Sequence, residues 1–323
     1  MTDRSLPLPE PPDVDALVAL ALAEDFGPTV SGSAGTDLDG AALLARDVTT
    51  SATIPPGARL SATVTARQDL VIAGLPYAQR AWTALAELAQ TGPVTFRALV
   101  AEGARVSAGT ALATLEGPAA VVLGAERTAL DFLMVLSGIA TESARWQDAA
   151  DAACRAIGRT SRLVITDTRK TVPGLRAASK YAVAVGGATN HRAGLWDMVL
   201  VKDNHLRLAG GVTAALEAAR AAHPNIPAEV EADSLGQAEE AARAGADIVL
   251  LDNMDDDELA EAVLVVGTAA AHAGRRCLTE ASGEVIFERL AALATTGVDR
   301  VSTSRLTLAP PVDVALDLAD AEA

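Results

Sequence analysis

The chain of 323 residues has few aromatic side chains, few lysines and only two cysteines. Aromatic residues make up 3% and hydrophobic residues 50%, so we expect a core of Ala, Val and Leu. Cys154 and Cys277 show neither metal-binding nor redox spacing and do not imply a disulfide framework. No charge-free apolar run is long enough to span a bilayer, and the polar, Pro-rich residues 1–15 contain no signal-peptide core. We therefore expect a soluble, cytoplasmic protein.

Positive charge is scarce and concentrated in one stretch. The formal net charge is -16, which argues against a nucleic-acid-binding surface. Residues 155–207 nevertheless hold ten Lys/Arg against three Asp, a local balance of +7. All three lysines, Lys170, Lys180 and Lys202, lie there, which suggests that a compact ammonium group is needed. A basic island in an acidic protein indicates a site for an anionic small molecule, although a solvated basic face would have the same composition.

The first half of the chain mixes helical and strand patterns. Residues 13–25 have helical spacing after an Asp start signal, and the Gly/Ser/Asp-rich Gly27–Ala45 is typical of a surface loop. A long helical stretch follows at residues 119–156, and we expect it to break near Ser137-Gly138. Arg127 lies on this stretch beside Glu126, where an ion pair on the helix surface is the simplest interpretation. Between these regions, strands are expected at 61–74, 93–100 and 111–117, with a helix at 74–90.

The second half alternates between apolar strands and helical segments. Such alternation predicts a parallel sheet with helical crossovers, and six units without a GxGxxG turn favour a barrel over a doubly wound sheet. The expected strands are 162–166, 197–201, 228–232, 247–251, 276–280 and 299–303.

Polar side chains follow almost every expected strand. In an α/β barrel the carboxyl ends of the strands form one rim, so these side chains should converge there. Arginines, lysines and a histidine suit carboxylate and phosphate oxygens, while Glu231 and Asp252 suit Mg²⁺ bound together with substrate phosphates. Both carboxylates could instead be paired with the basic cluster. The rim candidates are Asp167, Arg169, Lys170, His191, Arg192, Lys202, Asp203, Glu231, Asp233, Asp252, Asn253, Glu280, Ser282, Ser302 and Ser304.

Five segments carry a more specific resemblance: ERTALDFLMVLSGIAT, TDTRKTVPGLR, KYAVAVGGATNHRAGLWDMVLVKDNH, AEVEADSLGQAEEA and ADIVLLDNM. In this order they resemble the quinolinate phosphoribosyltransferase family, from about Asp47 to Thr307. The resemblance implies an N-terminal α/β sandwich domain at 1–137, joined by the tail 308–323. It also implies a C-terminal parallel α/β barrel with fewer than eight strands at 138–307, and a homodimer.

The resemblance further implies an activity. Quinolinate and phosphoribosyl pyrophosphate would become nicotinate mononucleotide, pyrophosphate and CO2, with Mg²⁺, in de novo NAD biosynthesis. Glu231 and Asp252 would lie near the ribose and the metal, and Arg127 would reach the neighbouring subunit's quinolinate. The implied catalytic residues are Lys170, Lys202, Glu231 and Asp252. The implied substrate-binding residues are these four together with Arg127, Arg169, His191, Arg192 and, at phosphate-binding turns, Ser282, Gly283 and Ser304.

Four departures from the family pattern leave alternatives open. Ala188 replaces the last glycine of a GGG motif, and Glu284 replaces the last glycine of an SGG motif. Ser302–Thr307 reads STSRLT where the family has SVGALT, and Asp131 ends ERTALD where the family has Asn. Glu284 adds negative charge at a phosphate turn and Arg305 adds positive charge, so the two could compensate as a pair. The alternatives are a paralogous phosphoribosyltransferase for another pyridine or aromatic carboxylate, a Schiff-base aldolase using Lys202, and a non-catalytic metabolite-binding protein.

Overall fold

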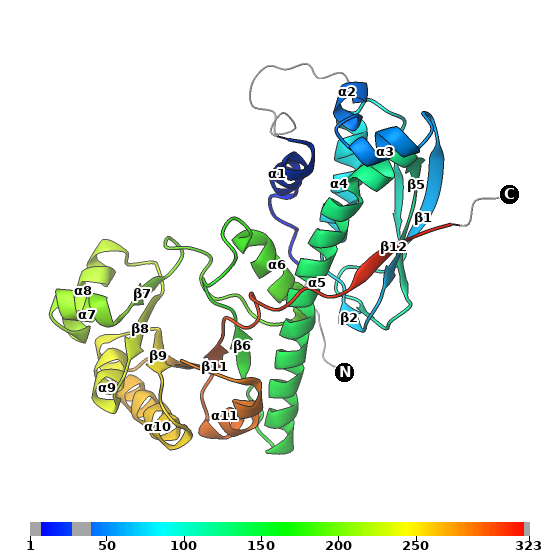
Figure 1. The fold of residues 1–323 in the computed structure, drawn as a ribbon. Coiled ribbons are helices and arrows are strands. Elements are labelled where there is room, and N and C mark those ends of the chain that lie inside the picture. The colour runs from blue at the N-terminus through cyan, green and yellow to red at the C-terminus, as the bar shows by residue number, and fades with distance from the viewer. Residues whose placement is uncertain (1–7, 28–39, 320–323) are drawn as a thin grey trace. The chain divides into compact units, whose positions relative to one another are not determined.

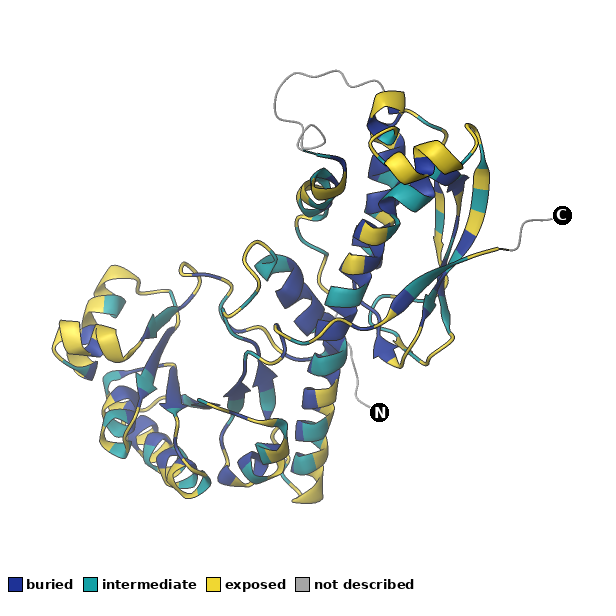
Figure 2. Cartoon of the chain, in the orientation of Figure 1, coloured by how far each residue is buried: buried dark blue, intermediate teal, exposed yellow. Residues whose placement is uncertain are grey.

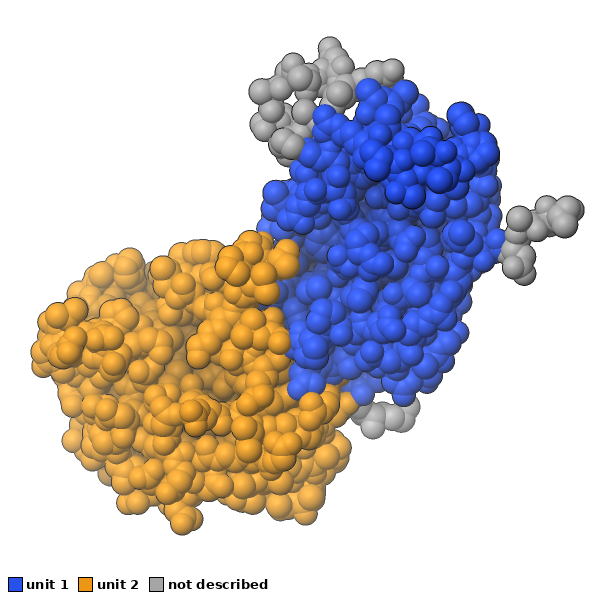
Figure 3. Space-filling model, viewed as in Figure 1, with its two compact units in different colours: residues 1–142, 177–186, 309–323 blue, residues 143–176, 187–308 orange. Residues whose placement is uncertain are grey.

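The computed structural model describes residues 8–27 and 40–319 (Figure 1). The chain divides into two compact units, coloured separately in Figure 3. The first comprises residues 1–142, 177–186 and 309–323, and the second comprises 143–176 and 187–308. The domain boundaries expected from the sequence, after residues 137 and 307, stay a prediction.

The first unit is built around a four-stranded antiparallel sheet in the order β12-β1-β5-β3. Helix α4 (Leu75–Leu88) carries two aromatic residues into the core: Tyr77 and Trp82 are fully buried, and Trp82 Nε1 donates to the carbonyl of Val122 at 3.0 Å. The strands are β1 (Arg59–Ala66), β3 (Thr95–Ala98), β5 (Ala111–Pro118) and β12 (Val314–Leu318), with a small pair, β2 (Leu70–Val71) and β4 (Arg105–Val106). The helices are α1 (Val14–Phe26), α2 (Gly40–Leu44), α3 (Val48–Thr53), α4 (Leu75–Leu88) and α6 (Arg176–Gly186).

Two expectations for this half of the chain were wrong. The expected loop Gly27–Ala45 contains helix α2, while residues 28–39 lie outside the described residues. The expected break near Ser137-Gly138 is absent, because α5 (Ala119–Ala156) runs through it as one helix of 38 residues. Gly138 is needed for close packing instead: a Cβ there would lie 2.3 Å from the carbonyl oxygen of Pro310.

The second unit contains the six predicted strands, all parallel, in the order β6-β11-β10-β9-β8-β7. This sheet confirms the predicted barrel with fewer than eight strands. Among the described residues no strand ladder joins β6 to β7, and a single parallel bridge between Thr166 and Thr189 extends the β6 edge. The strands are β6 (Val164–Thr166), β7 (Val199–Val201), β8 (Ala228–Ala232), β9 (Ile248–Asp252), β10 (Leu278–Ser282) and β11 (Arg300–Ser302). The helices are α7 (Asp203–Ala209), α8 (Val212–Ala222), α9 (Leu235–Ala244), α10 (Asp256–His272), η2 (Phe287–Arg289) and α11 (Leu290–Thr296).

Aliphatic side chains on the outer face of the barrel strands form the core of the second unit, as expected. Val230, Val249, Leu251 and Val301 are all completely buried on the strands. Figure 2 shows the strands mostly dark blue, while the helices outside them expose their outer faces. Among the described residues, no helix has the length and apolarity required to cross a membrane.

Candidate active site at the carboxyl ends of the barrel strands

The strands of the second unit place polar side chains in two layers. Alternate residues of a strand point to the same face, so Glu229 and Glu231 on β8 share a face, as do Glu280 and Ser282 on β10. The residue nearer the carboxyl end lies at the barrel rim, and the residue two positions earlier lies beneath it. Glu280 was predicted at the rim, but it is fully buried inside β10 and belongs to the lower layer.

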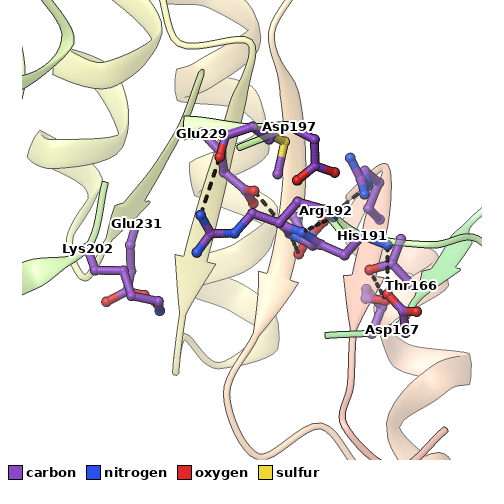
Figure 4. A network of polar contacts seen from close by, with 12 residues as sticks. Thr166, Asp167, His191, Arg192, Asp197, Lys202, Glu229 and Glu231 are labelled. Atoms are coloured by element: carbon purple, nitrogen blue, oxygen red, sulfur yellow. Dashed lines mark hydrogen bonds and ion pairs between the residues drawn. The ribbon is translucent and has the colours of Figure 1, made fainter. Parts of the chain in front are cut away.

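Lys202, Glu231 and Asp252 come together at the rim. Lys202 follows β7, and its ammonium forms an ion pair with Oε2 of Glu231 at the end of β8; Figure 4 shows the two side chains together. Asp252 ends β9, where Asn253 Nδ2 donates to its Oδ2 at 2.7 Å. Burial, and then the negative charge of Glu231, raise the pKa of Asp252 above its ordinary value. Of the two carboxylates, Glu231 is therefore paired with a residue of the basic cluster, Lys202, while Asp252 lies close to a second carboxylate, that of Glu231.

Arg169 and Arg192 form the cationic part of the site. Burial, followed by the positive charge of Arg169, lowers the pKa of Arg192, so the two guanidinium groups act on each other. Arg169 Nε is buried without a hydrogen-bond partner, and Arg192 donates to the carbonyl of Met198 at 3.3 Å. Two neighbouring cations with unused donors have a free-energy cost that an anionic ligand would relieve. Lys170 is exposed beside Arg169, and its carbonyl accepts from Thr307 Oγ1 at 2.7 Å.

His191 points into the barrel, away from the rim. Its side chain is 7% exposed, and Nε2 lies 3.0 Å from Oε2 of Glu229 and 3.3 Å from Oε1 of Glu280. Glu280 also pairs with Arg300, whose Nε lies 3.0 Å from Oε2. Figure 4 shows the imidazole directed at Glu229. We call His191, Glu229, Glu280 and Arg300 the buried charge layer.

Two contacts of His191 favour opposite protonation states. Burial lowers the pKa of the imidazole, but the two glutamates outweigh burial and raise it to about 9. The backbone N–H of Arg192, however, donates to Nδ1 at 2.8 Å, which requires a lone pair there. This contact is the more direct constraint, because a protonated Nδ1 would point its hydrogen at another N–H. We therefore assign a neutral ring with its proton on Nε2, and place the remaining proton on Glu229, whose pKa is raised by burial and by Glu280.

The expected phosphate turns follow β10 and β11. Ser282 ends β10 and its carbonyl accepts from the N–H of Asn253 at 3.1 Å. Gly283 has φ +85°, and a Cβ there would lie 2.1 Å from Oδ1 of Asn253. Glu284, exposed, also has a positive φ of 40°. Ser304 lies in the turn after β11, where its carbonyl accepts from Thr307 Oγ1 at 3.3 Å. Within the described residues, no ion pair joins Glu284 to Arg305.

Two basic residues singled out from the sequence lie in the first unit. Arg127 is exposed on α5 and pairs with Asp131 at 3.4 Å, so the expected surface ion pair exists, but with the residue four positions on. Lys180 is 5% exposed on α6. Lys180 is thus buried, whereas Lys170 and Lys202 are exposed, and a shared role of the three lysines stays a prediction.

Two groups of acidic residues could hold a cation. Glu231 and Asp252 form an accessible pair of like charges at the rim, and such a pair suits Mg²⁺ bound with substrate phosphates. His191, Glu229 and Glu280 also have ligand atoms within 4.8 Å of one another. In the second group, however, Arg300 already supplies a positive charge to Glu280. The first group is the better candidate.

Sequence reasoning missed Glu229 and Arg300. Both residues lie inside strands, so they carry no end-of-strand signal. The alternation of AEVEA does, however, indicate the direction of Glu229. Because Glu231 points into the barrel, Glu229 two residues earlier must point the same way. Arg300 likewise lies two residues before the rim candidate Ser302, but its pairing with Glu280 across β10 and β11 could not be read from the sequence.

Comparisons with known proteins agree on one family. Sequence models of the quinolinate phosphoribosyl transferase N-terminal and C-terminal domains match residues 47–137 and 139–317. A nicotinate-nucleotide pyrophosphorylase [carboxylating] from Mycobacterium leprae is 40% identical over 84% of this chain and 91% of its own length. The Homo sapiens enzyme of the same name is 41% identical over 67% of this chain and 70% of its own. A solved nicotinate-nucleotide pyrophosphorylase from Francisella tularensis has a TM-score of 0.78 and 30% identity over 97% of this chain and 98% of its own.

Proposed function

The chain belongs to the quinolinate phosphoribosyl transferase family, and we infer from this membership that it makes nicotinate mononucleotide for de novo NAD biosynthesis. The substrates are quinolinate and phosphoribosyl pyrophosphate, and the other products are pyrophosphate and CO2. The observation that carries this inference is the match of both domain models along the chain, together with a barrel rim that gathers cations beside two carboxylates.

We propose that Arg169 and Arg192 bind the carboxylates of quinolinate. A guanidinium group can bind a carboxylate through two parallel hydrogen bonds, which fixes the plane of the ring as well as its position. The mutual repulsion of the two arginines supports this role, because a dianion between them would remove it. Lys170 and Lys202, both exposed at the same rim, complete the set of cations for carboxylate or phosphate oxygens.

In the first step the pyridine nitrogen attacks the anomeric carbon of the ribose, and the bond from that carbon to the pyrophosphate oxygen breaks. Positive charge develops on the ribose as the leaving group departs. Glu231 and Asp252 are placed at the rim to stabilise this charge. No general base is needed, since the ring nitrogen has no proton to lose.

In the second step the bond between the ring and its 2-carboxylate breaks. The electron pair stays on the ring, whose nitrogen is now positively charged, and the carbon then takes up a proton while CO2 leaves. The cations around the carboxylate orient it for this step. The reaction thus needs little more from these residues than position and charge.

We further propose that Mg²⁺ is bound through Glu231 and Asp252 together with the pyrophosphate of the donor. A carboxylate whose pKa is raised by a neighbouring carboxylate, as that of Asp252 is by Glu231, fits a divalent cation. When bound, the ion would neutralise charge on the leaving pyrophosphate.

We also propose a cytoplasmic homodimer in which Arg127 reaches the quinolinate of the neighbouring subunit. Arg127 is exposed and holds only Asp131 within the described chain, so its guanidinium has donors left for a ligand. Both substrates are multiply charged metabolites, which fits a cytoplasmic enzyme.

The test is product formation by the purified protein with quinolinate, phosphoribosyl pyrophosphate and Mg²⁺. Nicotinate mononucleotide and CO2 should appear in equal amounts, and omission of Mg²⁺ should stop both. Folded protein that makes neither product would contradict the assignment.

One observation supports a second candidate function. Glu284 adds a negative charge, with strained backbone, at the expected phosphate turn. A paralogous transferase with another pyridine or aromatic carboxylate as its acceptor is the corresponding alternative, and a panel of such acids with the same donor would reveal it. The aldolase alternative is disfavoured, because a Schiff-base lysine must be a free neutral amine, whereas Lys202 is paired with Glu231.

A further inference from the structure

The buried charge layer lies beneath the rim and has no direct route to a substrate. Glu229 and Glu280 are 0% exposed, and the side chain of Arg300 is 16% exposed. Burying two carboxylates has a high free-energy cost unless cations or hydrogen bonds compensate them. Nothing in the proposed reaction uses Glu229, Glu280 or Arg300 directly.

His191 connects this layer to the rim. On one side its Nε2 lies 3.0 Å from a carboxylate oxygen of Glu229 and 3.3 Å from one of Glu280. On the other side its Nδ1 accepts the backbone N–H of Arg192 at 2.8 Å. The backbone N–H of His191 itself donates to Oδ1 of Asp167 at 2.7 Å. The orientation of the imidazole therefore fixes the peptide that carries Arg192.

Arg192 needs such support. Its guanidinium is repelled by Arg169 and attracted by Glu229 and Asp197, and it donates one hydrogen bond, to the carbonyl of Met198 at 3.3 Å. A long side chain repelled by its neighbour would move away from the site unless its backbone were fixed. Two-point binding of a carboxylate tolerates little displacement, and a shift of about 1 Å can cost on the order of a hundredfold in rate.

We propose that Glu229 and Glu280 are positioning residues for Arg192, and that they act on it through the imidazole of His191. Arg300 holds Glu280 in place for the same purpose. The functional consequence rests on the proposed function, because it assumes that Arg192 binds quinolinate.

A double-mutant cycle tests the proposal, with quinolinate affinity measured by calorimetry. Glu280→Gln should weaken binding by about tenfold or more when Arg192 is present. In an Arg192→Lys background, which has no two-point fork to orient, the same change should have less than about a twofold effect. Equal effects in both backgrounds would show that Glu280 acts independently of Arg192, and would overturn the proposal.

Hydrogen exchange supplies a readout that does not depend on quinolinate. Peptides containing the amides of His191 and Arg192 should exchange faster in Glu280→Gln than in the unmodified chain, while peptides from α1 should not change. Unchanged exchange at these two amides would contradict the proposal. If the unmodified protein fails to bind quinolinate, the proposed function is wrong. Hydrogen exchange at His191 and Arg192 then still tests whether Glu280 positions Arg192.

Two further variants separate positioning from folding and from metal binding. Glu280→Gln/Arg300→Gln removes one charge of each sign, so it should fold even if Glu280→Gln does not, and it should show the same faster exchange. Glu239→Gln, in a surface ion pair with Arg243, is the matched control and should change neither exchange nor affinity. One equivalent of zinc, iron or manganese that survives chelation, and is lost in Glu280→Gln, would make the layer a metal site instead.

Discussion

Lys202 and Glu231, at the ends of the neighbouring strands β7 and β8, form an ion pair beside the carboxylate of Asp252. Glu231 is thus neutralised by a partner, whereas Asp252 is not paired with a cation in the described chain. Burial and the charge of Glu231 both make ionised Asp252 unfavourable. Asp252 is therefore the residue at which function and stability should conflict.

We predict that Asp252→Asn abolishes turnover but raises the melting temperature at neutral pH. Because the pKa of Asp252 is raised on folding, its ionisation costs the folded state free energy above the ordinary Asp range. Below that range Asp252 is protonated in both states, so the advantage of Asn should vanish as the pH falls. Thermal unfolding of both proteins from about pH 7 down to about pH 3.5 measures this. A variant that is less stable at neutral pH would contradict it.

Loss of the rim cations should abolish turnover without unfolding the protein. Arg169→Ala and Lys202→Ala remove exposed or half-buried charge at the site and no core packing. Circular dichroism should be unchanged while product formation disappears. Arg243→Ala, on the surface of α9, serves as the control and should keep full activity. Lys180→Ala should retain substrate affinity but lose stability, because Lys180 is buried. Full activity in Arg169→Ala or Lys202→Ala would disprove the assignment of these residues to the active site.

Subunit mixing can test whether Arg127 acts across a dimer interface. Arg127→Ala and Lys202→Ala should each be inactive alone. After equal amounts are mixed and allowed to reassociate, half of the dimers are mixed, and each contains one intact site. About a quarter of the unmodified activity should return. No recovery, with exchange of subunits demonstrated, would place Arg127 in its own subunit's site or outside any site.

Glu284 should weaken donor binding through charge and not through strain. Glu284→Gly and Glu284→Gln both remove the charge, but only Gly relieves the positive φ of 40°. If charge matters, both variants should bind phosphoribosyl pyrophosphate several-fold more tightly, a gain on the order of 1 kcal/mol. If only Gly improves binding, the backbone is the cause. Direct titration with the donor distinguishes these results.

The sequence predicted the barrel well because its signals are local. Each short apolar strand followed by a polar side chain is recognisable by itself, and all six strands were found where expected. The buried charge layer was not found, because Glu280 resembles any other residue near a strand end until its burial is known. The same limit explains why the expected helix break was wrong. A glycine within a helical pattern suggests a break, but Gly138 is required because the backbone of Pro310, 172 residues later, leaves no room for a side chain. Features that depend on distant partners leave little trace in one chain.

The last strand of the first unit has a consequence for how the protein is made. β12 covers one edge of β1, although β1 ends at Ala66 and β12 begins only at Val314. While the ribosome synthesises the barrel, that edge of β1 stays open, and an open strand edge is a template for pairing with other chains. A chain that ends before Val314 would keep this edge open permanently. Premature termination at the 3′ end of the message should therefore yield aggregating protein, even though every residue of the barrel rim would be present.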